Sequence, residues 1–553
     1  MNTIQIYCEN TGGYIDVAGG ESLASIAARL QLGFEPLCAR VNNKTEGMHY
    51  CIYRPKTVEF TGADSASGKR AYVRSLCMLL YCAVRRVLPE ARLHIQHSIQ
   101  RGYYCTLNDH AGYLPATPRA LAEIAAEMRR MTAADMPFEH CEARTADVVE
   151  IFRSQGLDDK VLLLETMHMP YTVYYRLGDT CDSYYGTLVP RTGLLRTFDL
   201  RPYKKGFILL ASEQAIVEPE IPQEKMYKAF TDYVEFNHIL GVCNAGEMNR
   251  MVQNRHAADL INLAEALHNK HLGQIADEIT RRYHAGGARV VLIAGPSSSG
   301  KTTTTKRLAI QLMANLLKPQ MISLDDYFVD RHTTPLDEHG DYDYESLYAL
   351  DLKQFNKDLN AILRGEEVEL PTYNFELGRR EYRGNRLRLD RGGILLIEGI
   401  HGLNPELTAQ VAEDMKFRVY VSALTTLTID SHNWVPTTDT RLLRRIIRDY
   451  KYRGISARES IRRWPSVRRG EERWIFPYQE NADATFNSSL LFELGAIRKY
   501  AERTLEDVHS DEREYSEAYR LRRFLQHFEP IPDDLIPPTS LLREFLGGSS
   551  FHY

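Results

Sequence analysis

The chain has 553 residues, of which 44% are hydrophobic and 25% charged, and its 68 Lys and Arg against 73 Asp and Glu give a net charge of −5. This composition is ordinary for soluble globular proteins and excludes a fibrous or largely disordered chain. The negative balance argues against non-specific binding to nucleic acid or anionic membrane through a global basic field. At roughly 150 residues per domain, the length predicts three or four domains.

The first residues do not resemble an export signal. They lack a basic segment followed by a long apolar one, and the longest apolar stretch, Leu76–Val84, is far shorter than the roughly 20 residues of a membrane-spanning helix. The nine cysteines are scattered between Cys8 and Cys243 without a C-x-x-C pair, which is typical of reduced thiols. We therefore expect a cytoplasmic protein that does not contact a membrane.

The first 60 residues alternate short β-rich runs with one helical pattern, Ser22–Leu30, which indicates a small β-grasp-like unit. From about 62 to 220, predicted helices alternate with predicted strands, and a proline-rich run at Glu218–Pro222 indicates a boundary. Residues 223 to about 285 show helical spacing of apolar residues. The predicted elements are strands at Thr3–Tyr7, Tyr14–Val17, Thr57–Phe60, Val161–Thr166 and Gly206–Leu210, and helices at Ala71–Val87, Pro118–Met131 and Asp259–Ile279.

A phosphate-binding loop follows. The apolar run Arg289–Ala294 predicts a buried strand of a parallel sheet, and the next eight residues, GPSSSGKT, fit G-x-x-x-x-G-K-[ST] before a helical stretch. Loop and helix N–H groups cradle phosphates, the lysine reaches the outer phosphates, and the threonine hydroxyl ligates Mg²⁺. The residues predicted to bind ATP here are Gly295, Pro296, Ser297, Ser298, Ser299, Gly300, Lys301, Thr302 and Thr303.

Two further apolar runs end in carboxylates. The run from Pro319 ends in Asp325-Asp326, and Gly393–Ile397 ends in Glu398. Strand ends of doubly wound sheets face the ligand crevice, where a carboxylate accepts a proton from an attacking hydroxyl or holds the metal. For the aspartate pair alone, a solvated turn or helix cap is an equal alternative.

An arginine-rich helix is predicted near residue 440. Arg441, Arg445 and Arg448 lie at spacings of four and three, so they share one helix face. Guanidinium groups match phosphate geometry, which favours a phosphate clamp. A solvated helix or a nucleic-acid patch is the alternative.

Residues about 288 to 500 resemble the uridine kinase and phosphoribulokinase group of P-loop kinases. The motifs that carry the resemblance are Gly295–Thr302, Ser323–Asp325, Tyr342-Asp343, Pro371–Phe375, Ile397–Ile400 and Asp439–Gly454. The resemblance implies an α/β P-loop fold with a parallel sheet and a helical lid. It also implies transfer of the γ-phosphoryl group of ATP, with Mg²⁺, to the 5′-hydroxyl of a nucleoside such as uridine or cytidine.

The resemblance also implies roles for single residues. Asp325 corresponds to the general base, Lys301, Arg445 and Arg448 to groups near the phosphates, and Arg453 to a lid residue at ATP. Thr302, Glu398 and Asp325 are the expected metal-associated positions, and Asp343, Tyr373 and Phe375 the expected substrate contacts. Three positions depart from the family pattern: the expected histidine, arginine and glutamine are Gly378, Ile455 and Arg463. Another small alcohol is therefore a second candidate acceptor.

The amino-terminal half carries a second resemblance. Residues 1–61 resemble a TGS domain and 62–220 the editing domain of threonyl-tRNA synthetase, on the motifs Arg101–Tyr104 and Val189–Phe198. The four positions that line the synthetase site fall on Arg74, Met78, Tyr184 and Leu188. None is a usual zinc ligand, so we expect a degenerate site retained for packing, dimerisation or ligand sensing. His94 and His97 are interpreted as ordinary surface or core residues rather than metal ligands.

The expected organisation has five parts. They are a β-grasp domain (1–61), an α+β editing-like domain (62–220), a helical linker (221–285), the P-loop kinase domain (286–505) and a helical tail (506–553) that packs as a partner helix or strap. The leading function is a nucleoside kinase, and a homodimer is expected by analogy. The alternative of another class is a regulatory protein that binds RNA through its amino-terminal domains and uses ATP as a switch.

Overall fold

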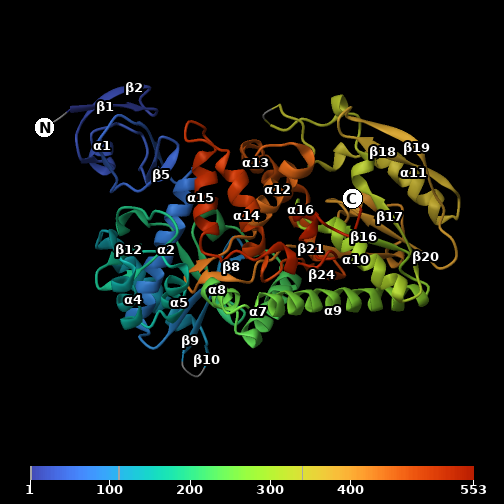
Figure 1. The fold of residues 1–553 in the computed structure, drawn as a ribbon, viewed down its shortest axis with the longest axis horizontal. Helices are drawn as coiled ribbons and strands as arrows, with labels where there is room; N and C mark the ends of the chain where they lie inside the picture. Colours follow the sequence, from blue (N-terminus) through green and yellow to red (C-terminus); the bar gives the residue numbers. More distant parts are fainter. Residues whose placement is uncertain (1–2, 110–111, 339, 553) are drawn as a thin grey trace.

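The computed structural model describes residues 3–109, 112–338 and 340–552. The molecule is elongated, with the amino-terminal domains at one end and the parallel sheet of the carboxyl-terminal part at the other (Figure 1). Helices α12 (Thr437–Arg453), α13 (Ala457–Trp474), α14 (Glu493–Glu506) and α15 (Tyr515–Leu525) lie between these ends. Among the described residues, no helix is both long and apolar enough to cross a membrane.

The first unit is a small sheet packed on one helix. Its strands are β1 (Thr3–Cys8), β2 (Gly13–Ala18), β3 (Glu21–Ser22), β4 (Cys38–Val41), β5 (Lys44–Glu46), β6 (Cys51–Ile52) and β7 (Thr57–Thr61). Five of them form a sheet in the order β2-β1-β7-β4-β5. Helix α1 (Leu23–Ala28) is capped by the Ser22 hydroxyl, which accepts the N–H of Ser25, and it buries Leu23 and Ile26. The predicted β-grasp-like unit is confirmed.

The second unit contains a long buried helix and two sheets. Its elements are α2 (Ala66–Val87), β8 (Arg92–Ile99), β9 (Gly102–Asp109), β10 (Gly112–Leu114), α3 (Pro118–Ala133), β11 (Glu139–Arg144), α4 (Thr145–Ser154), α5 (Asp158–Met167), β12 (Tyr171–Leu177), β13 (Thr180–Asp182), β14 (Asp199–Tyr203), β15 (Gly206–Leu210) and α6 (Glu213–Val217). One sheet has the order β10-β9-β15-β14, with β8 also paired to β9, and the other has the order β11-β12-β13. Helix α2 packs against β8 and α3.

The predicted strand at Val161–Thr166 is wrong, because this segment lies in helix α5. The apolar run resembles a buried strand, but it is apolar because the helix lies between two cores. Val161 and Leu164 belong to the core of the editing-like domain, whereas Leu163 belongs to the core of the carboxyl-terminal part. A helix buried on two faces has no amphipathic periodicity from which to recognise it.

Three helices connect the second unit to the parallel sheet: α7 (Glu224–Leu240), α8 (Ala245–Gln253) and α9 (Ala257–His284). The 28-residue α9 runs along the edge of the molecule (Figure 1) and packs against α10 (Lys301–Ala314). Its Leu272, Ala276 and Ile279 join the same core as the sheet residues Val291 and Ile293. The predicted helical linker therefore forms one hydrophobic core with the P-loop domain.

The central sheet of the carboxyl-terminal part is parallel throughout, in the order β17-β20-β16-β21-β24. Alternate residues of each strand face opposite cores: Val291 and Ile293 of β16 face α9 and α10, whereas Val290 and Leu292 face α11 (Leu352–Leu363). The expected α/β fold is confirmed. The strands of this part are β16 (Val290–Ala294), β17 (Lys318–Ser323), β18 (Val368–Asn374), β19 (Arg379–Leu387), β20 (Gly393–Glu398), β21 (Lys416–Ser422), β22 (Thr428–Asp430), β23 (Asn433–Trp434) and β24 (Ala484–Asn487).

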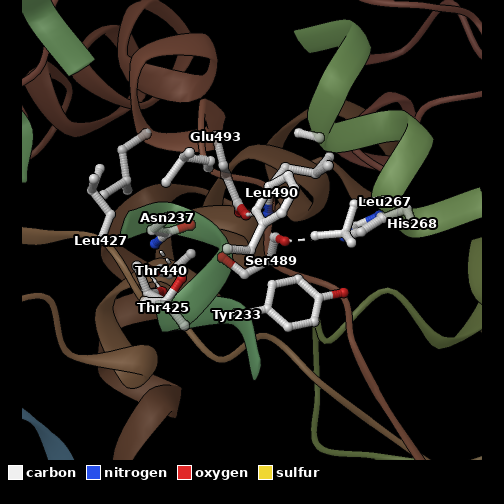
Figure 2. Close-up of a pocket in the computed structure, with 15 residues that line it drawn as sticks. Tyr233, Asn237, Leu267, His268, Thr425, Leu427, Thr440, Ser489, Leu490 and Glu493 are labelled. Atoms are coloured by element: carbon white, nitrogen blue, oxygen red, sulfur yellow. Dashed lines mark hydrogen bonds between the residues drawn. The ribbon is translucent and has the colours of Figure 1, made fainter. Parts of the chain in front are cut away.

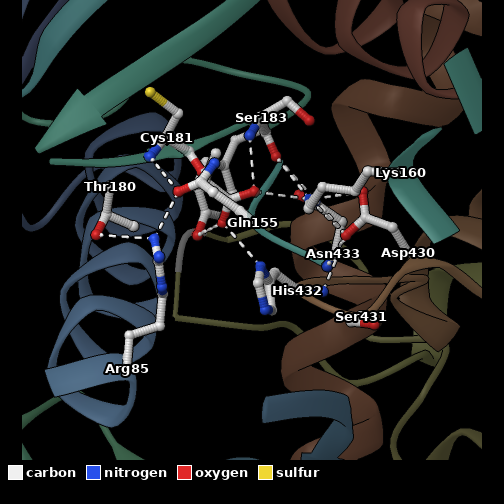
Figure 3. Close-up of polar contacts among 12 residues, drawn as sticks. Arg85, Gln155, Lys160, Thr180, Cys181, Ser183, Asp430, Ser431, His432 and Asn433 are labelled. Carbon is white, nitrogen blue, oxygen red and sulfur yellow. Dashed lines mark hydrogen bonds and ion pairs between the residues drawn. The ribbon is translucent and has the colours of Figure 1, made fainter. Parts of the chain in front are cut away.

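The β22–β23 hairpin anchors the two halves of the molecule to each other. Lys160 of α5 lies 2.8 Å from Asp182 of β13 and 2.8 Å from Asp430 of β22, and His432 lies 2.8 Å from Asp182 (Figure 3). All four side chains are at most 2% exposed. Burial alone would lower the pKa of Lys160, but the two carboxylates outweigh burial and hold that pKa above its ordinary value.

Replacing Lys160 by methionine is expected to destabilise the whole chain. The substitution leaves two buried carboxylates without their cation, and breaking a buried ion pair in this way costs about 3–5 kcal/mol. Urea unfolding of the full-length chain measures the loss. Lys205→Met, at an exposed lysine of the same half, is the control and should change stability by less than about 0.5 kcal/mol. Equal losses in the two variants would contradict this assignment.

Candidate active site

The loop between β16 and α10 has the geometry that its sequence predicts. Gly300 has a φ of 81° and precedes the first residue of α10. A side chain at Gly295 would place its Cβ 2.0 Å from the carbonyl oxygen of Val421. Glycine is therefore required at position 300 for its backbone conformation, and at position 295 because strand β21 lies too close for a side chain.

Buried groups from α12 and the end of β24 hold the carbonyl side of this loop. Arg441 Nε donates to the Ser297 carbonyl (2.9 Å), Arg444 Nη1 to that of Ser298 (3.4 Å), and the Ser488 hydroxyl to that of Ser299 (2.5 Å). These carbonyl oxygens are thus engaged by the protein itself. The loop is preorganised before any ligand arrives.

The predicted role of Arg441 in a phosphate clamp is wrong. Its side chain is 2% exposed and forms a buried ion pair with Glu471, just as the neighbouring Arg444 pairs with Glu493. A buried guanidinium needs a carboxylate partner, so Arg441 supports the loop from behind. Helical spacing alone could not separate this supporting face from a ligand-facing one.

The remaining lid arginines gather around one buried carboxylate. Arg445, Arg448 and Arg453 lie 3.2, 3.1 and 3.3 Å from Asp449, whose side chain is 1% exposed. Arg445 also donates to the Ser297 hydroxyl at 3.0 Å. Burial lowers the pKa of both Arg445 and Arg453. The excess of positive charge in this cluster faces the P-loop and suits an anionic ligand.

The strand-end carboxylates lie where the parallel sheet brings them together. Glu398 pairs in register with Ser323 of β17 and Ile293 of β16. Its Oε1 accepts a hydrogen bond from the Thr302 hydroxyl at 3.0 Å. Burial raises the pKa of Glu398 to about 7, with the negative charge of Asp325 adding to the effect and Lys301 opposing it.

Asp325 and Asp326 have different environments. They lie in a short 3₁₀ helix (Leu324–Tyr327) that directly follows β17. Asp325 is exposed and close enough to Lys301 and Glu398 to affect both their pKa values. Asp326 is partly buried and accepts the backbone N–H of Tyr373 at 3.1 Å. Asp325 is therefore the one that faces the P-loop groups.

Lys301 completes this cluster. Its Nζ donates to the Pro296 carbonyl at 3.2 Å. Burial lowers its pKa, while Glu398 and Asp325 oppose the shift. The structure thus brings together the four predicted residues Lys301, Thr302, Asp325 and Glu398.

The predicted substrate residues lie on the β18–β19 side of the sheet. Tyr373 is buried, and its ring centre lies 5.6 Å from that of Phe328 and 5.1 Å from that of Phe375, which is 59% exposed. Asp343 lies in the loop before α11, where its carboxylate accepts the N–H of Glu345 at 3.1 Å. Among the described residues, neither Asp343 nor Phe375 lines one of the main cavities of the structure.

The departure at Gly378 has a steric reason. This glycine has a φ of 65°, and a Cβ there would lie 2.8 Å from the side chain of Arg331. Arg331 also holds this turn in place, because its backbone N–H donates to the Gly378 carbonyl at 2.8 Å. A histidine at this position would meet both backbone strain and the arginine. The other departures, Ile455 and Arg463, lie on the lid, where Arg463 pairs with Glu459 at 2.6 Å.

Sequence reasoning missed several residues of this site. Glu544, in the carboxyl-terminal helix α16 (Arg543–Leu546), accepts the N–H and the hydroxyl of Thr303 at 3.2 and 2.6 Å. Glu345 is close enough to Arg445 and Lys301 for their charges to offset part of the pKa rise that burial causes. The carboxyl-terminal tail thus packs as the expected strap, and it contacts the start of α10 through the Glu544 carboxylate.

The oxygen donors present suit Mg²⁺. The Thr302 hydroxyl and Glu398 carboxylate are in contact, and Asp325 is nearby. Mg²⁺ is usually bound by one or two carboxylates together with substrate phosphates and water. Within residues 3–109, 112–338 and 340–552, no group of three or more His, Cys, Asp or Glu side chains forms a metal cage. The loop therefore fits a metal that arrives with a nucleotide.

A small cavity with a mixed apolar and polar lining is too small for a substrate. It lies between α7, α9 and the start of α12, with Asn237, His268 and Thr440 among its lining residues (Figure 2). Its volume is about 20 Å³, and one water needs about 10–15 Å³ measured in this way. The cavity therefore has room for about one water molecule and not for a nucleoside.

The editing-like positions do not form a metal site. Met78 and Leu188 are buried apolar residues, Tyr184 donates to Asp182 at 2.7 Å, and Arg74 lines a cavity described below. His97 stacks on Phe230 with ring centres 3.4 Å apart, and burial lowers its pKa to about 3.

The comparisons with known proteins agree with this two-part architecture. Residues 290–490 match the model of the Phosphoribulokinase / Uridine kinase family. The chain is 28% identical over 193 residues to the uridine kinase of Halobacterium salinarum, covering 34% of this chain and 76% of that protein. The carboxyl-terminal part is therefore similar to this family over residues 290–490.

The amino-terminal region matches threonine–tRNA ligases. The chain is 29% identical over 192 residues to the ligase of Desulforamulus reducens, covering 34% of this chain and 30% of the ligase, so it spans about a third of that protein's length. The solved structure of a possible uridine kinase from Bacillus stearothermophilus has 20% identity and a TM-score of 0.26, covering 39% of this chain and 98% of that one. Both resemblances predicted from the sequence are confirmed.

Replacing Glu544 by alanine is expected to strengthen ATP binding. The carboxylate occupies two donors at the start of α10 that a phosphate would use, and hydrogen bonds to charged groups contribute about 1.5–3 kcal/mol. We expect the Kd for ATP, measured by calorimetry on the full-length chain, to fall by about tenfold. Asp534→Ala, at an exposed aspartate of the same tail, should leave the Kd unchanged. Weaker ATP binding in Glu544→Ala would contradict the expectation that the Glu544 carboxylate competes with a phosphate for these donors.

Proposed function

We propose that this protein is an ATP-dependent kinase that transfers the γ-phosphoryl group to the 5′-hydroxyl of a nucleoside, with uridine and cytidine as the first candidates. The observation that carries the proposal is the arrangement of the Thr302–Glu398 hydrogen bond beside Lys301 and the exposed Asp325. The family match over residues 290–490 supports phosphoryl transfer.

In this mechanism Asp325 is the general base. It is exposed at the end of β17, on the side of Lys301 and Glu398. As the acceptor oxygen attacks the γ-phosphorus, its proton passes to the Asp325 carboxylate, and the bond to the β-phosphate oxygen breaks. ADP and the phosphorylated acceptor are the products.

Cationic groups stabilise the charge on the transferring phosphoryl group. Lys301 lies at the start of α10, and Arg445 and Arg448 approach from α12. Because burial lowers the pKa of Lys301 and Arg445, phosphate oxygens are favourable partners for both cations. Mg²⁺ held by Thr302 and Glu398, with Asp325 nearby, would neutralise further phosphate charge.

A kinase of another small alcohol is the second candidate, because two positions that would contact the base carry no polar side chain. Gly378 carries no side chain to read a base, and Ile455 offers no hydrogen bond. Phe375, which is exposed and is supported by the buried Tyr373 ring, offers an aromatic face on which a planar base would stack. This observation favours a nucleoside over a simple polyol.

The activity test is ADP release from Mg²⁺ and ATP by the full-length chain across a panel of nucleosides and small alcohols. Asp325→Asn should lower kcat by about 100-fold or more, because general-base catalysis contributes about 10²–10⁴. The Kd for ATP should stay within about twofold, since the loop and Lys301 are retained.

Asp326→Asn is the matched control. Its amide oxygen can still accept the Tyr373 N–H, so kcat should fall far less than in Asp325→Asn. If kcat falls equally in the two variants, both aspartates stabilise the segment after β17 and Asp325 is not the general base. An absence of turnover with every acceptor, while ATP binds, would overturn the kinase proposal.

A further inference from the structure

A large cavity lies where the β-grasp unit, the editing-like domain and helix α15 meet, and no P-loop residue lines it. Its volume is about 320 Å³, within the range of small-molecule sites. Lys44 and His49 come from the first unit, Arg74 and His140 from the second, and Arg523 from α15. Three separate parts of the chain thus contribute to a single cavity.

The walls of this cavity carry more positive than negative charge. Five lining residues are cationic and two are anionic: Lys44, Arg70, Arg74, Arg520 and Arg523 against Glu46 and Asp430. Most of these charges are neutralised by ion pairs. Lys44 pairs with Glu46 at 2.7 Å, Arg70 with Glu517 at 3.0 Å, and Arg520 with Asp439 at 2.6 Å, while Asp430 pairs with Lys160.

Two arginines remain without a carboxylate. Arg74 is only 8% exposed, and in the part of the chain that the structure describes no ion pair or hydrogen bond reaches its guanidinium group. Its contact is with the Tyr185 ring, whose centre lies 5.0 Å from the guanidinium carbon. Arg523 is exposed at the rim and donates to Gln526.

A buried cation without a paired carboxylate is unfavourable. Glu517 is close enough for Arg74 to lower its pKa, but this carboxylate already pairs with Arg70 and Arg520. Burial lowers the pKa of Arg74, and the neighbouring Arg70 and Arg520 add to this effect. An anion in the cavity would relieve both the desolvation and the repulsion. A phosphate monoester carries a charge of about −1.5 to −2 near pH 7, which matches the two unpaired guanidinium groups.

The cavity also offers flat aromatic faces. The rings of His49 and His140 stack with centres 3.9 Å apart, and burial, with His140 as the second cause, lowers the pKa of His49 to about 4. His49 is therefore neutral at pH 7. Tyr171, Tyr185 and Tyr519 also line the cavity. Such walls suit a planar ring attached to the phosphate.

We propose that this cavity is a second ligand site that binds a nucleoside monophosphate, with Arg74 and Arg523 at the phosphate and the aromatic walls at the base. The site is separate from the P-loop and does not depend on the proposed kinase activity. Arg74 and Tyr184 stand at positions that line the catalytic site in threonyl-tRNA synthetase editing domains, so the same place in the fold would bind an anion instead.

The experiment measures binding of UMP, AMP and inorganic phosphate by calorimetry to the full-length Lys301→Ala chain, in which the P-loop is disabled. UMP or AMP should bind with one site that depends on the cavity. Adding Arg74→Met should weaken this binding by at least about tenfold, the usual effect of one lost charge-assisted contact. Adding Arg523→Gln, which changes only an exposed side chain, should weaken it in the same direction.

Arg119→Met removes an exposed arginine of the same domain and should leave the affinity unchanged. Arg74→Met should melt at the same or a higher temperature, because it removes an unpaired buried cation. Nucleotide binding that neither cavity substitution changes would overturn the proposal. If inorganic phosphate binds as tightly as UMP, the ligand is not a nucleotide and the proposal is wrong. If a CCA-ended RNA hairpin binds but no mononucleotide does, the proposal is also wrong and the site binds RNA.

Discussion

The structure of the P-loop end of the molecule depends on the buried ion pairs of α12. Arg441 with Glu471 and Arg444 with Glu493 are almost completely excluded from solvent, and the same two arginines donate to carbonyls of the P-loop. Guanidinium groups can do both because they carry five donors in a fixed plane. The shape of the phosphate-binding loop is therefore set by residues about 150 positions further along the chain.

This constraint changes the interpretation of the lid. The family resemblance suggests that the arginine-rich segment closes over the nucleotide as a unit. In this chain the first half of α12 is part of the scaffold, and only the second half, from Arg445 to Arg453, offers cations around Asp449. Gly454, with a φ of 64°, ends α12, and α13 beyond it supplies Glu471, the buried partner of Arg441, so α13 is tied to the same scaffold.

Features encoded by adjacent residues could be predicted from the sequence. The strand, loop and helix around Gly295–Thr302 follow from a local pattern, and parallel pairing of β17, β16 and β20 brings Asp325 and Glu398 to the same edge of the sheet. The α5 segment was mistaken for a strand because its surroundings, two separate cores, come from distant parts of the chain. Glu544 could not be found either, since nothing in the carboxyl-terminal sequence shows that it reaches Thr303.

The two halves share α12 as a common element. Arg520, which lines the cavity between the β-grasp unit, the editing-like domain and α15, pairs with Asp439 in the first turn of α12. Arg445 on the same helix reaches Ser297 of the P-loop. The Lys160 cluster fixes the β22–β23 hairpin, immediately before α12, to the editing-like domain. A rigid helix anchored at both ends transmits a displacement at one end to the other, whereas a flexible linker would absorb it. The amino-terminal half is therefore built into the support of the P-loop, and it could not be exchanged for an unrelated domain without changing that support.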